Sequence, residues 1–272
     1  MMYSEFSPCR ALRPYVDKYW EFKGSLRVGK RIHILPDGCA DFIFTLDGGM
    51  YGTATPSGMQ PYRSYFVGPM TKYESLEIRS ATVHQMGIRF RPGGVFRFLQ
   101  LPIDRLADTR IDTAALGCFF NDSWADRLDE KKEVGERIHL LEELLLKRFF
   151  IYKGTEEPKI RFVINQIDCS HGKLPIGDLA GAVHLCPRQL ERKFKGITGF
   201  TPKAYSRIIR FRHTVDLLRN SPFENLLSTA VEAGYYDVSH LCRETKEMSG
   251  GSPLSFLSAP EPKEITLTYI EG

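Results

Sequence analysis

The 272-residue sequence lacks the patterns that identify several large classes of protein. No apolar run approaches the roughly 18–20 residues that a membrane-spanning helix needs. The first residues show no basic segment followed by an apolar core, as a secretory signal would. The six cysteines are scattered without a Cys-x-x-Cys pair, which argues against a disulfide framework or a zinc knuckle. We therefore expect a cytoplasmic protein that does not enter the membrane.

Catalytic motifs are missing as well. The sequence has no GxxxxGK[ST] phosphate loop, no GxSxG nucleophile elbow and no GxGxxG. His33, His84, Asp37 and Asp41 are the residues from which a metal site would be built, but no H-x-H or H-E-x-x-H spacing is present. We expect no enzymatic activity, no bound metal and no cofactor.

The N-terminal half instead has the pattern of a β-rich domain. Between residues 19 and 90, short runs rich in β-branched and aromatic residues alternate with turn sequences. Three of these turns are Pro36-Asp37-Gly38, Asp47-Gly48-Gly49 and Pro56-Ser57-Gly58. A short helix is expected at 95–99, after Gly93 and Gly94. The series predicts a small barrel or sandwich with flanking helices over residues 1–152.

An amphipathic helix closes this first half. Its apolar residues recur at steps of three and four, and they are Val134, Ile138, Leu141, Leu145 and Phe149. Such a stripe identifies a buried face but not its partner. The helix either packs on its own barrel or meets its copy in a second subunit.

Residues 153–158 form the predicted linker, because they are polar, contain a glycine and a proline, and show no periodicity. We expect a helical domain over 159–258 and a tail over 259–272. Within the tail, residues 265–270 alternate like a strand.

A helix-turn-helix pattern occupies residues 176–197. After a helix near 176–184 and a short turn, Pro187 stands where a new helix would begin, since its missing N–H is unpaired at that position anyway. The new helix buries Leu190, Phe194 and Ile197. Its opposite face presents Arg188, Glu191, Arg192 and Lys195. We interpret this face as a surface that enters a major groove, although Glu191 could instead pair with a neighbouring cation.

A second unit repeats the pattern. Gly199, Thr201 and Pro202 fit the end of one helix and the start of the next, over 202–219, which at 1.5 Å per residue is about 27 Å long. A helix at 225–232 follows, expected to bury Leu226, Ala230 and Val231, and then one capped by Asp237. A connecting helix of this length can hold two reading helices about 34 Å apart, one turn of DNA. Between residues 188 and 212 the basic residues stand against a single acidic one, Glu191, as in a phosphate-binding face.

The C-terminal hundred residues resemble the DNA-binding domain of the AraC/XylS family of bacterial transcription regulators. The motifs that carry the likeness are Leu179-Ala180, Leu190-Glu191-Arg192-Lys193-Phe194-Lys195, Thr198-Gly199-Phe200-Thr201-Pro202, Arg210-Phe211-Arg212, Ala230-x-x-x-Gly234-Tyr235, Asp237-x-Ser239-His240 and Gly250-x-Ser252-Pro253. The N-terminal half resembles the leading domain of a subset of these regulators at Tyr19-Trp20, at 34–38, at 41–44 and at 87–94. The resemblance implies an α+β chain, with a β-rich barrel-like domain followed by an all-α domain of about seven helices that contains two helix-turn-helix units.

The resemblance also implies roles for individual residues. It implies that base edges are contacted by Arg188, Glu191 and Arg192 in the first unit and by Val238, Ser239, Cys242 and Arg243 in the second. Lys195, Arg207, Arg210 and Lys246 fit phosphate contacts better. The implied partners are double-stranded promoter DNA, RNA polymerase, a small-molecule effector and a second copy of the chain.

The second unit departs from the family pattern. Thr245 and Leu241 stand where aromatic residues are usual, and Thr229 replaces an aliphatic one. Because a lost buried ring typically costs several kcal/mol, we expect a softer second unit that contributes mainly backbone contacts.

The effector site is unknown at this point, and Arg89, Arg91, His33 and His84 are weak candidates for it. Arg89 and Arg91 share one face if their strand is regular, where they could hold an acidic ligand or form inter-strand salt bridges. Two alternatives for the N-terminal half stay open: an enzyme such as an alkyl-transfer protein, and a domain that recruits a protein partner.

Overall fold

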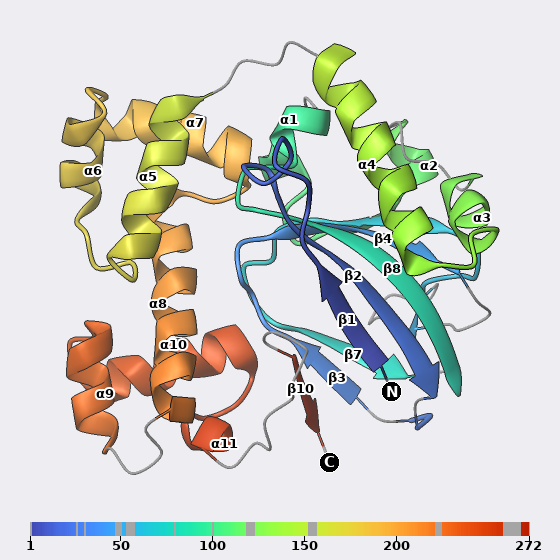
Figure 1. Cartoon of the computed structure of the whole chain (residues 1–272). Helices are drawn as coiled ribbons and strands as arrows, with labels where there is room; N and C mark the ends of the chain where they lie inside the picture. The colour runs from blue at the N-terminus through green and yellow to red at the C-terminus, as the bar shows by residue number, and fades with distance from the viewer. Residues whose placement is uncertain are drawn as a thin grey trace.

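The computed structural model describes residues 2–25, 27–29, 31–46, 51–52, 58–78, 80–99, 101–117, 123–151, 157–220, 225–257 and 268–271. A β-rich N-terminal region lies beside a helical C-terminal domain, and the long helix α8 runs along the boundary between them (Figure 1). This arrangement confirms the predicted fold class.

Two antiparallel sheets form the β-rich region. The larger sheet is built, in spatial order, from β1 (Met2–Phe6), β2 (Val16–Ser25), β8 (Thr82–Phe90), β4 (Ala40–Thr45), β6 (Ser64–Val67) and β9 (Arg110–Asp112). The smaller sheet is built from β10 (Thr268–Glu271), β3 (Arg31–Ile34), β7 (Glu74–Ile78) and β5 (Tyr51–Gly52). The predicted strand in the tail therefore exists as β10, which pairs with β3, while residues 258–267 lie outside the described residues.

The turn predicted at Pro36-Asp37-Gly38 is present. The Asp37 Oδ1 accepts a hydrogen bond from the Cys39 N–H at 2.9 Å, and Gly38 has a φ of +83°, which a glycine adopts without strain. The turn predicted at 47–49 and most of the one at 56–58 lie outside the described residues.

Helices cover one face of the larger sheet (Figure 1). They are α1 (Phe96–Leu99), a short 3-10 turn at Ile103–Arg105, α2 (Thr113–Leu116), α3 (Ser123–Asp129) and α4 (Val134–Ile151). In α4, Leu141 and Leu145 are fully buried in the same core as Phe42 and Phe90 of the sheet. The apolar stripe of α4 therefore packs on its own barrel, which decides between the two alternatives.

One charged residue of α4 is buried although it lies outside the apolar stripe. Arg137 donates to Glu21 at 2.6 Å and to the carbonyl oxygens of Leu128 and Lys131. The Glu21 Oε1 atom also lies 2.9 Å from His84 Nε2. This buried triad ties α4 to strands β2 and β8.

The described C-terminal residues form seven helices, as the family resemblance implied. They are α5 (Pro158–Cys169), α6 (Ile176–Ala182), α7 (Pro187–Thr198), α8 (Pro202–Asn220), α9 (Leu226–Ala233), α10 (Val238–Ser249) and α11 (Leu254–Leu257). Most of the predicted linker, residues 153–156, lies outside the described residues.

The predicted caps of these helices are present. Gly199 ends α7 in the left-handed region at φ +87°, the Thr201 hydroxyl accepts from the Ala204 N–H at 3.1 Å, and the Asp237 carboxylate accepts from the His240 N–H at 2.6 Å. The expectation for Val231 is wrong: it is 71% exposed, because α9 turns Thr229, Ala230 and Ala233 inward instead. None of the described helices is long and apolar enough to span a membrane.

Candidate nucleic-acid interface

Local sequence fixes which face of α7 points outward. The helix starts at Pro187, and Cys186 and Gln189 form a capping box at its first turn. Leu190 and Phe194 are fully buried in the core of the helical domain, and this anchors one side of the helix. Arg188, Glu191, Arg192 and Lys195 consequently all lie on the exposed side. The charged surface expected from the sequence is therefore present and uncovered.

The charges on this face are available to an external partner. Among the described residues, no ion pair involves Arg188, Glu191, Arg192 or Lys195. Glu191 thus does not form the intrahelical pair that was its alternative. Lys193, on the flank of α7, lies 3.5 Å from the Glu157 carboxylate, an exposed pair that contributes little stability.

A groove separates the two helix-turn-helix units. It has a volume of about 590 Å³ and lies between the start of α6, the side of α8 and α10. Its basic lining residues are Lys173, Lys203, Arg207, Arg210 and Arg243. Lysine and arginine side chains gathered in a groove between the two units are chemically suited to phosphate contacts.

Two of the predicted phosphate-binding residues already have partners inside this groove. Arg207 donates to Glu244 at 3.1 Å and to Glu247 at 2.6 Å. Burial alone would lower the pKa of Arg207, but its hydrogen bonds to these carboxylates raise it. Arg210 donates to the Gly172 carbonyl oxygen at 3.2 Å and lies over the Tyr235 ring. Contacts within the protein therefore hold both guanidinium groups in place, and both groups also face the groove.

The second reading helix, α10, presents a mixed surface. Ser239, Arg243 and Lys246 are exposed, whereas Val238 and Cys242 are half-buried against a small cluster that contains Leu241. The structure thus brings Arg243 into the groove with Arg207 and Arg210, and it leaves Val238 and Cys242 with less surface for a base edge. Lys173 and Lys203, which no site assignment from the sequence included, line the same groove.

The four weak ligand candidates do not form one site. His84 pairs with Glu21, and His33 stacks on Tyr73 with 5.4 Å between ring centroids. Arg91 lies just past the end of β8, where it pairs with Asp17 at 3.3 Å and donates to the Arg13 carbonyl oxygen. Contrary to the expectation, Arg91 therefore does not share a strand face with Arg89.

Arg89 is the one of these four that lines a cavity inside the β-rich region. The cavity has a volume of about 160 Å³ and lies between the two sheets, with Trp20, Phe22 and Met59 among its apolar residues. Arg89 forms ion pairs with Asp37 and with Asp41, which faces it across strands β8 and β4. The predicted inter-strand salt bridge is thus present. Among the described residues, no cluster of three or more metal-ligating side chains occurs.

The two halves of the molecule are in direct contact. Leu35, which follows β3, is buried in the core of the helical domain. At Gly38 an added Cβ atom would lie 2.6 Å from the Tyr205 ring of α8, so the backbone and the ring touch. Arg212, also on α8, donates to the Asp37 carbonyl oxygen at 3.3 Å. The segment from Leu35 to Cys39 therefore joins the barrel cavity to the connecting helix of the helical domain.

Comparison with known proteins supports this description of the helical domain. Residues 179–259 match the profile of a family described as a helix-turn-helix domain, and residues 4–112 match that of a domain of unknown function, DUF6597. ToxT from Vibrio cholerae has a similar fold, with a TM-score of 0.50 and 13% sequence identity over 88% of this chain and 97% of that one. The C-terminal domain is an AraC-type helix-turn-helix domain.

Smaller structures match this domain alone. A transcriptional regulator with an AraC-type DNA-binding domain from Chromobacterium violaceum is 21% identical over 39% of this chain and 96% of its own, with a TM-score of 0.35. A search of curated proteins finds no match. The helix-turn-helix match identifies a DNA-binding transcription regulator.

Proposed function

We propose that α7 reads base edges in the major groove of double-stranded promoter DNA, and that the N-terminal region controls this binding through a small-molecule effector. The exposed face of α7 carries the proposal, because four charged side chains lie there without an internal ion pair. An arginine bridges guanine O6 and N7, and a glutamate accepts a hydrogen bond from cytosine N4. Arg188, Arg192 and Glu191 are assigned these contacts.

The remaining basic residues position the duplex. Lys195 extends the charge of α7 along its exposed side, Arg207 and Arg210 line the groove, and Lys246 is exposed on α10. Contacts of this kind go to phosphate oxygens and do not distinguish sequences. Within α10, Ser239 and Arg243 are the residues best exposed for a base contact, and Val238 and Cys242 contribute less.

We assign effector binding to the cavity between the two sheets of the β-rich region. It is mostly apolar, with Asp37, Asp41, Gln85, Arg89 and Arg110 as polar groups, and this combination is typical of a small-molecule site. An effector that displaces Arg89 from Asp37 would move the segment against which Tyr205 and Arg212 of α8 lie. That segment supplies a physical link between the cavity and the DNA-binding domain.

The domain assignment follows the same division: a sensing domain over 1–152, a linker over 153–158, the DNA-binding domain over 159–258 and a tail over 259–272. The regulator is proposed to act in the cytoplasm without enzymatic activity. RNA polymerase and a second copy of the chain are further proposed partners. The exposed Phe150 and Ile151 at the end of α4 offer a surface for such a contact, at 72% and 74% exposure.

The test of the reading role is a pair of substitutions on α7. Duplexes bound by the full chain are first selected from random DNA. Arg192→Ala is expected to cost about 1–3 kcal/mol of affinity for the selected site and to relax the preference at one base pair. Lys195→Ala is expected to weaken binding to all sequences alike and to flatten its salt dependence by about one phosphate contact. Identical behaviour of both variants on selected and random DNA would refute the assignment.

A further inference from the structure

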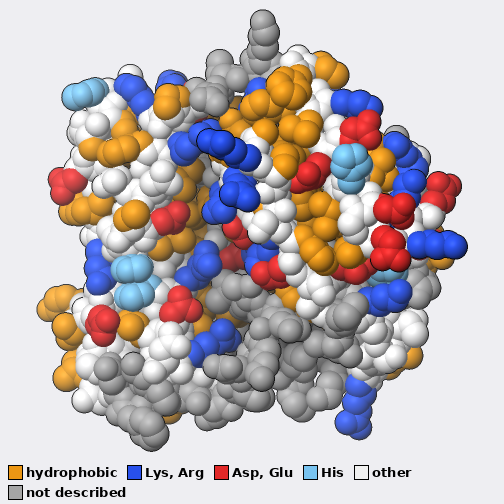
Figure 2. Space-filling model, in the orientation of Figure 1, with side chains coloured by type: hydrophobic (Ala, Val, Ile, Leu, Met, Phe, Trp, Pro, Cys, Tyr) orange, Lys and Arg blue, Asp and Glu red, His pale blue; other side chains and the backbone are white. Residues whose placement is uncertain are grey.

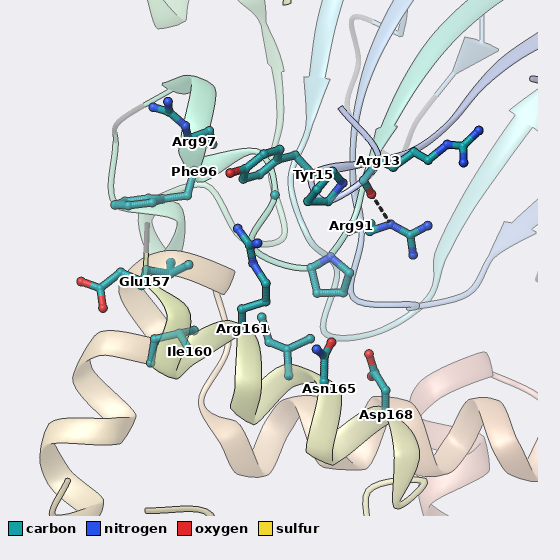
Figure 3. Close-up of a pocket in the computed structure, with 16 residues that line it drawn as sticks. Arg13, Tyr15, Arg91, Phe96, Arg97, Glu157, Ile160, Arg161, Asn165 and Asp168 are labelled. Atoms are coloured by element: carbon teal, nitrogen blue, oxygen red, sulfur yellow. Dashed lines mark hydrogen bonds between the residues drawn. The ribbon is translucent and has the colours of Figure 1, made fainter. Parts of the chain in front are cut away.

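One short segment of the β-rich half touches the ends of both reading helices. It is the loop between β6 and β7, residues 68–73, which we call the β6–β7 loop. The boundary between the two halves is hollowed, with Lys and Arg side chains gathered along it (Figure 2). At one place a cavity of about 330 Å³ lies between Tyr15 and α5 (Figure 3). Direct contact across this boundary is therefore not continuous, and the β6–β7 loop is one of the segments that make it.

The first contact of the loop is at the end of α7. Gly199, which caps this helix, is buried, and an added Cβ atom there would lie 3.3 Å from Pro69 Cγ and 3.4 Å from Ile103 Cγ2. Pro69 is buried as well. The backbone at the end of α7 therefore lies directly against the Pro69 ring and the Ile103 side chain.

The second contact is at the corresponding end of α10. Gly250 caps α10 as Gly199 caps α7, and an added Cβ atom at Gly250 would lie 2.6 Å from Tyr73 Cζ and 2.8 Å from the Tyr73 hydroxyl oxygen. The half-buried Tyr73 ring packs against the apolar core of the helical domain, and its stacking partner is His33 of β3. The ring is therefore held between the smaller sheet and the end of α10.

Hydrogen bonds hold the loop in one conformation. The Asp108 N–H donates to the Pro69 carbonyl oxygen at 3.0 Å. The Asp108 carboxylate accepts from the Thr71 N–H and from the Thr71 hydroxyl, both at 2.7 Å. Pro69 and Tyr73 are four positions apart in the chain, so a loop tied down between them fixes the contact at α7 relative to the contact at α10.

We propose that the β6–β7 loop braces α7 and α10 at their C-terminal ends, and that it thereby sets the separation at which the two helices meet a duplex. Successive major grooves on one side of a duplex are about 34 Å apart, so two helices that bind them must be held at a matching separation. Pro69 and Tyr73 are the positioning residues of this brace, and neither is assigned a DNA contact. The inference rests on the DNA contacts proposed above for both helices.

The loop also forms part of the wall of the cavity between the two sheets. Gly68 and Met70, on either side of Pro69, line that cavity. A ligand bound there contacts the loop beside the residue that lies against α7. The brace therefore gives the cavity a second route to the helical domain, besides the segment from Leu35 to Cys39.

The brace is tested first without DNA, in the purified full-length protein. Spin labels are introduced as non-natural amino acids at Lys195 of α7 and Lys246 of α10, which are both exposed, so the native cysteines stay unlabelled. Double electron–electron resonance is expected to give one narrow distance peak for the otherwise unaltered protein. Tyr73→Ala removes the ring at the end of α10, and it is expected to replace the narrow peak by a broad distribution.

Two further variants serve as controls for Tyr73→Ala. Tyr73→Phe keeps the ring and is expected to keep the narrow peak. Tyr62→Ala makes the same change at a tyrosine of the same half that is 45% exposed, and it should leave the peak as it is. An unshifted narrow peak in folded Tyr73→Ala overturns the brace. If Tyr73→Ala does not fold, Pro69→Ala is measured in its place and decides in the same way.

DNA binding then shows whether the brace serves the function. Tyr73→Ala is expected to bind the full selected duplex about tenfold more weakly, because its second reading helix must be ordered during binding. On a shortened duplex that carries only the segment protected by α7, the variant and the wild type should bind equally. An equal loss on both duplexes, or no loss on the full one, contradicts the brace.

The outcome is separable from that of the α7 assignment. Arg192→Ala should lose affinity on the full and the shortened duplex alike, because α7 binds both. An Arg192→Ala variant that binds as the wild type does refutes the reading role of α7. If Arg192→Ala behaves as proposed while Tyr73→Ala is unchanged in both its distance peak and its affinity, the brace alone is refuted.

Discussion

The two helix-turn-helix units share a topology but differ in their interiors. In the first, α7 buries Leu190 and Phe194 in a large apolar core to which α5, α6 and α8 all contribute. In the second, the separate cluster contains Ala230, Ala233, Tyr235 and Leu241 as its buried members. The first unit therefore holds its reading helix in a large core. The second holds α10 partly in a small cluster that contains two alanines and partly through Met248, which is buried in the large core.

Polar groups take the place of apolar ones in the second unit. Thr245 is fully buried, and its hydroxyl has no hydrogen-bond partner among the residues that the structure describes. Glu244 is buried beside Arg207 and His240. A buried hydroxyl without a partner costs free energy, and a buried carboxylate is stable only with its cation in place. The two units of a single domain therefore differ in how their interiors are built, and the softer second unit expected from the sequence stays a prediction.

The largest expected effect is on the interior of the first unit. Phe194→Ala should lower the free energy of unfolding by about 3–5 kcal/mol, because it empties the centre of a core shared by several helices. Leu241→Ala in the second unit should cost about 2 kcal/mol, toward the low end for such a change, because its small neighbours leave less packing to lose. Urea unfolding followed by circular dichroism gives both values.

Hydrogen exchange separates the two changes further. Phe194→Ala should accelerate exchange throughout α5 to α8, whereas Leu241→Ala should accelerate it mainly in α9 and α10. Equal losses of stability, with exchange raised over the same residues, would remove the distinction between the units.

Local signals made the ends of both reading helices predictable from the sequence. Pro187, Gly199 and Asp237 mark helix ends through their own backbone chemistry, and the steps between Leu190 and Phe194 set the exposed face of α7. The ends and faces of such helices depend on residues within a turn or two. They need no knowledge of distant partners.

Contacts between distant residues could not be read in the same way. Arg137 is buried because Glu21, 116 positions away, accepts its hydrogen bond, and Arg207 meets Glu244 from 37 positions away. A charged residue in a helical pattern is expected at the surface unless its partner is known, and Arg207 was accordingly assigned to a phosphate contact. The cavity between Tyr15 and α5 is of the same kind, since its two walls come from different halves of the chain.

The middle-sized effect concerns the buried hydroxyl of the second unit. Thr245→Val keeps the shape of the side chain and removes the unpartnered hydroxyl, so it should raise the free energy of unfolding by about 1 kcal/mol. Thr198→Val is the matched change in the first unit. The Thr198 hydroxyl donates to the Phe194 carbonyl oxygen at 2.8 Å and accepts from the Phe200 N–H at 3.2 Å, so its loss should destabilise by about 1–2 kcal/mol. Substitutions that act with the same sign would show that the second unit is packed as well as the first.

The smallest expected effect lies at the joint between the units. His171, before α6, stacks on His213 of α8 with 3.9 Å between ring centroids, and Lys173 donates to the Glu232 carbonyl oxygen of α9. Burial, and then the neighbouring His171, lower the pKa of His213 below its ordinary 6.5. The unfolded chain therefore takes up this proton more readily, so stability is complete above pH 6.5 and declines as the pH falls below it.

The thermal midpoint of the wild type should accordingly decrease slightly when the pH is lowered below 6.5. In His213→Gln the midpoint should decrease less over the same pH range. His171→Gln is the matched control: it keeps His213 but removes the neighbouring imidazole, so the midpoint should fall less than in the wild type and more than in His213→Gln. Hydrogen exchange in α9 shows whether the joint opens toward the second unit. Equal pH dependence in all three proteins would mean that the stacked pair does not respond to pH.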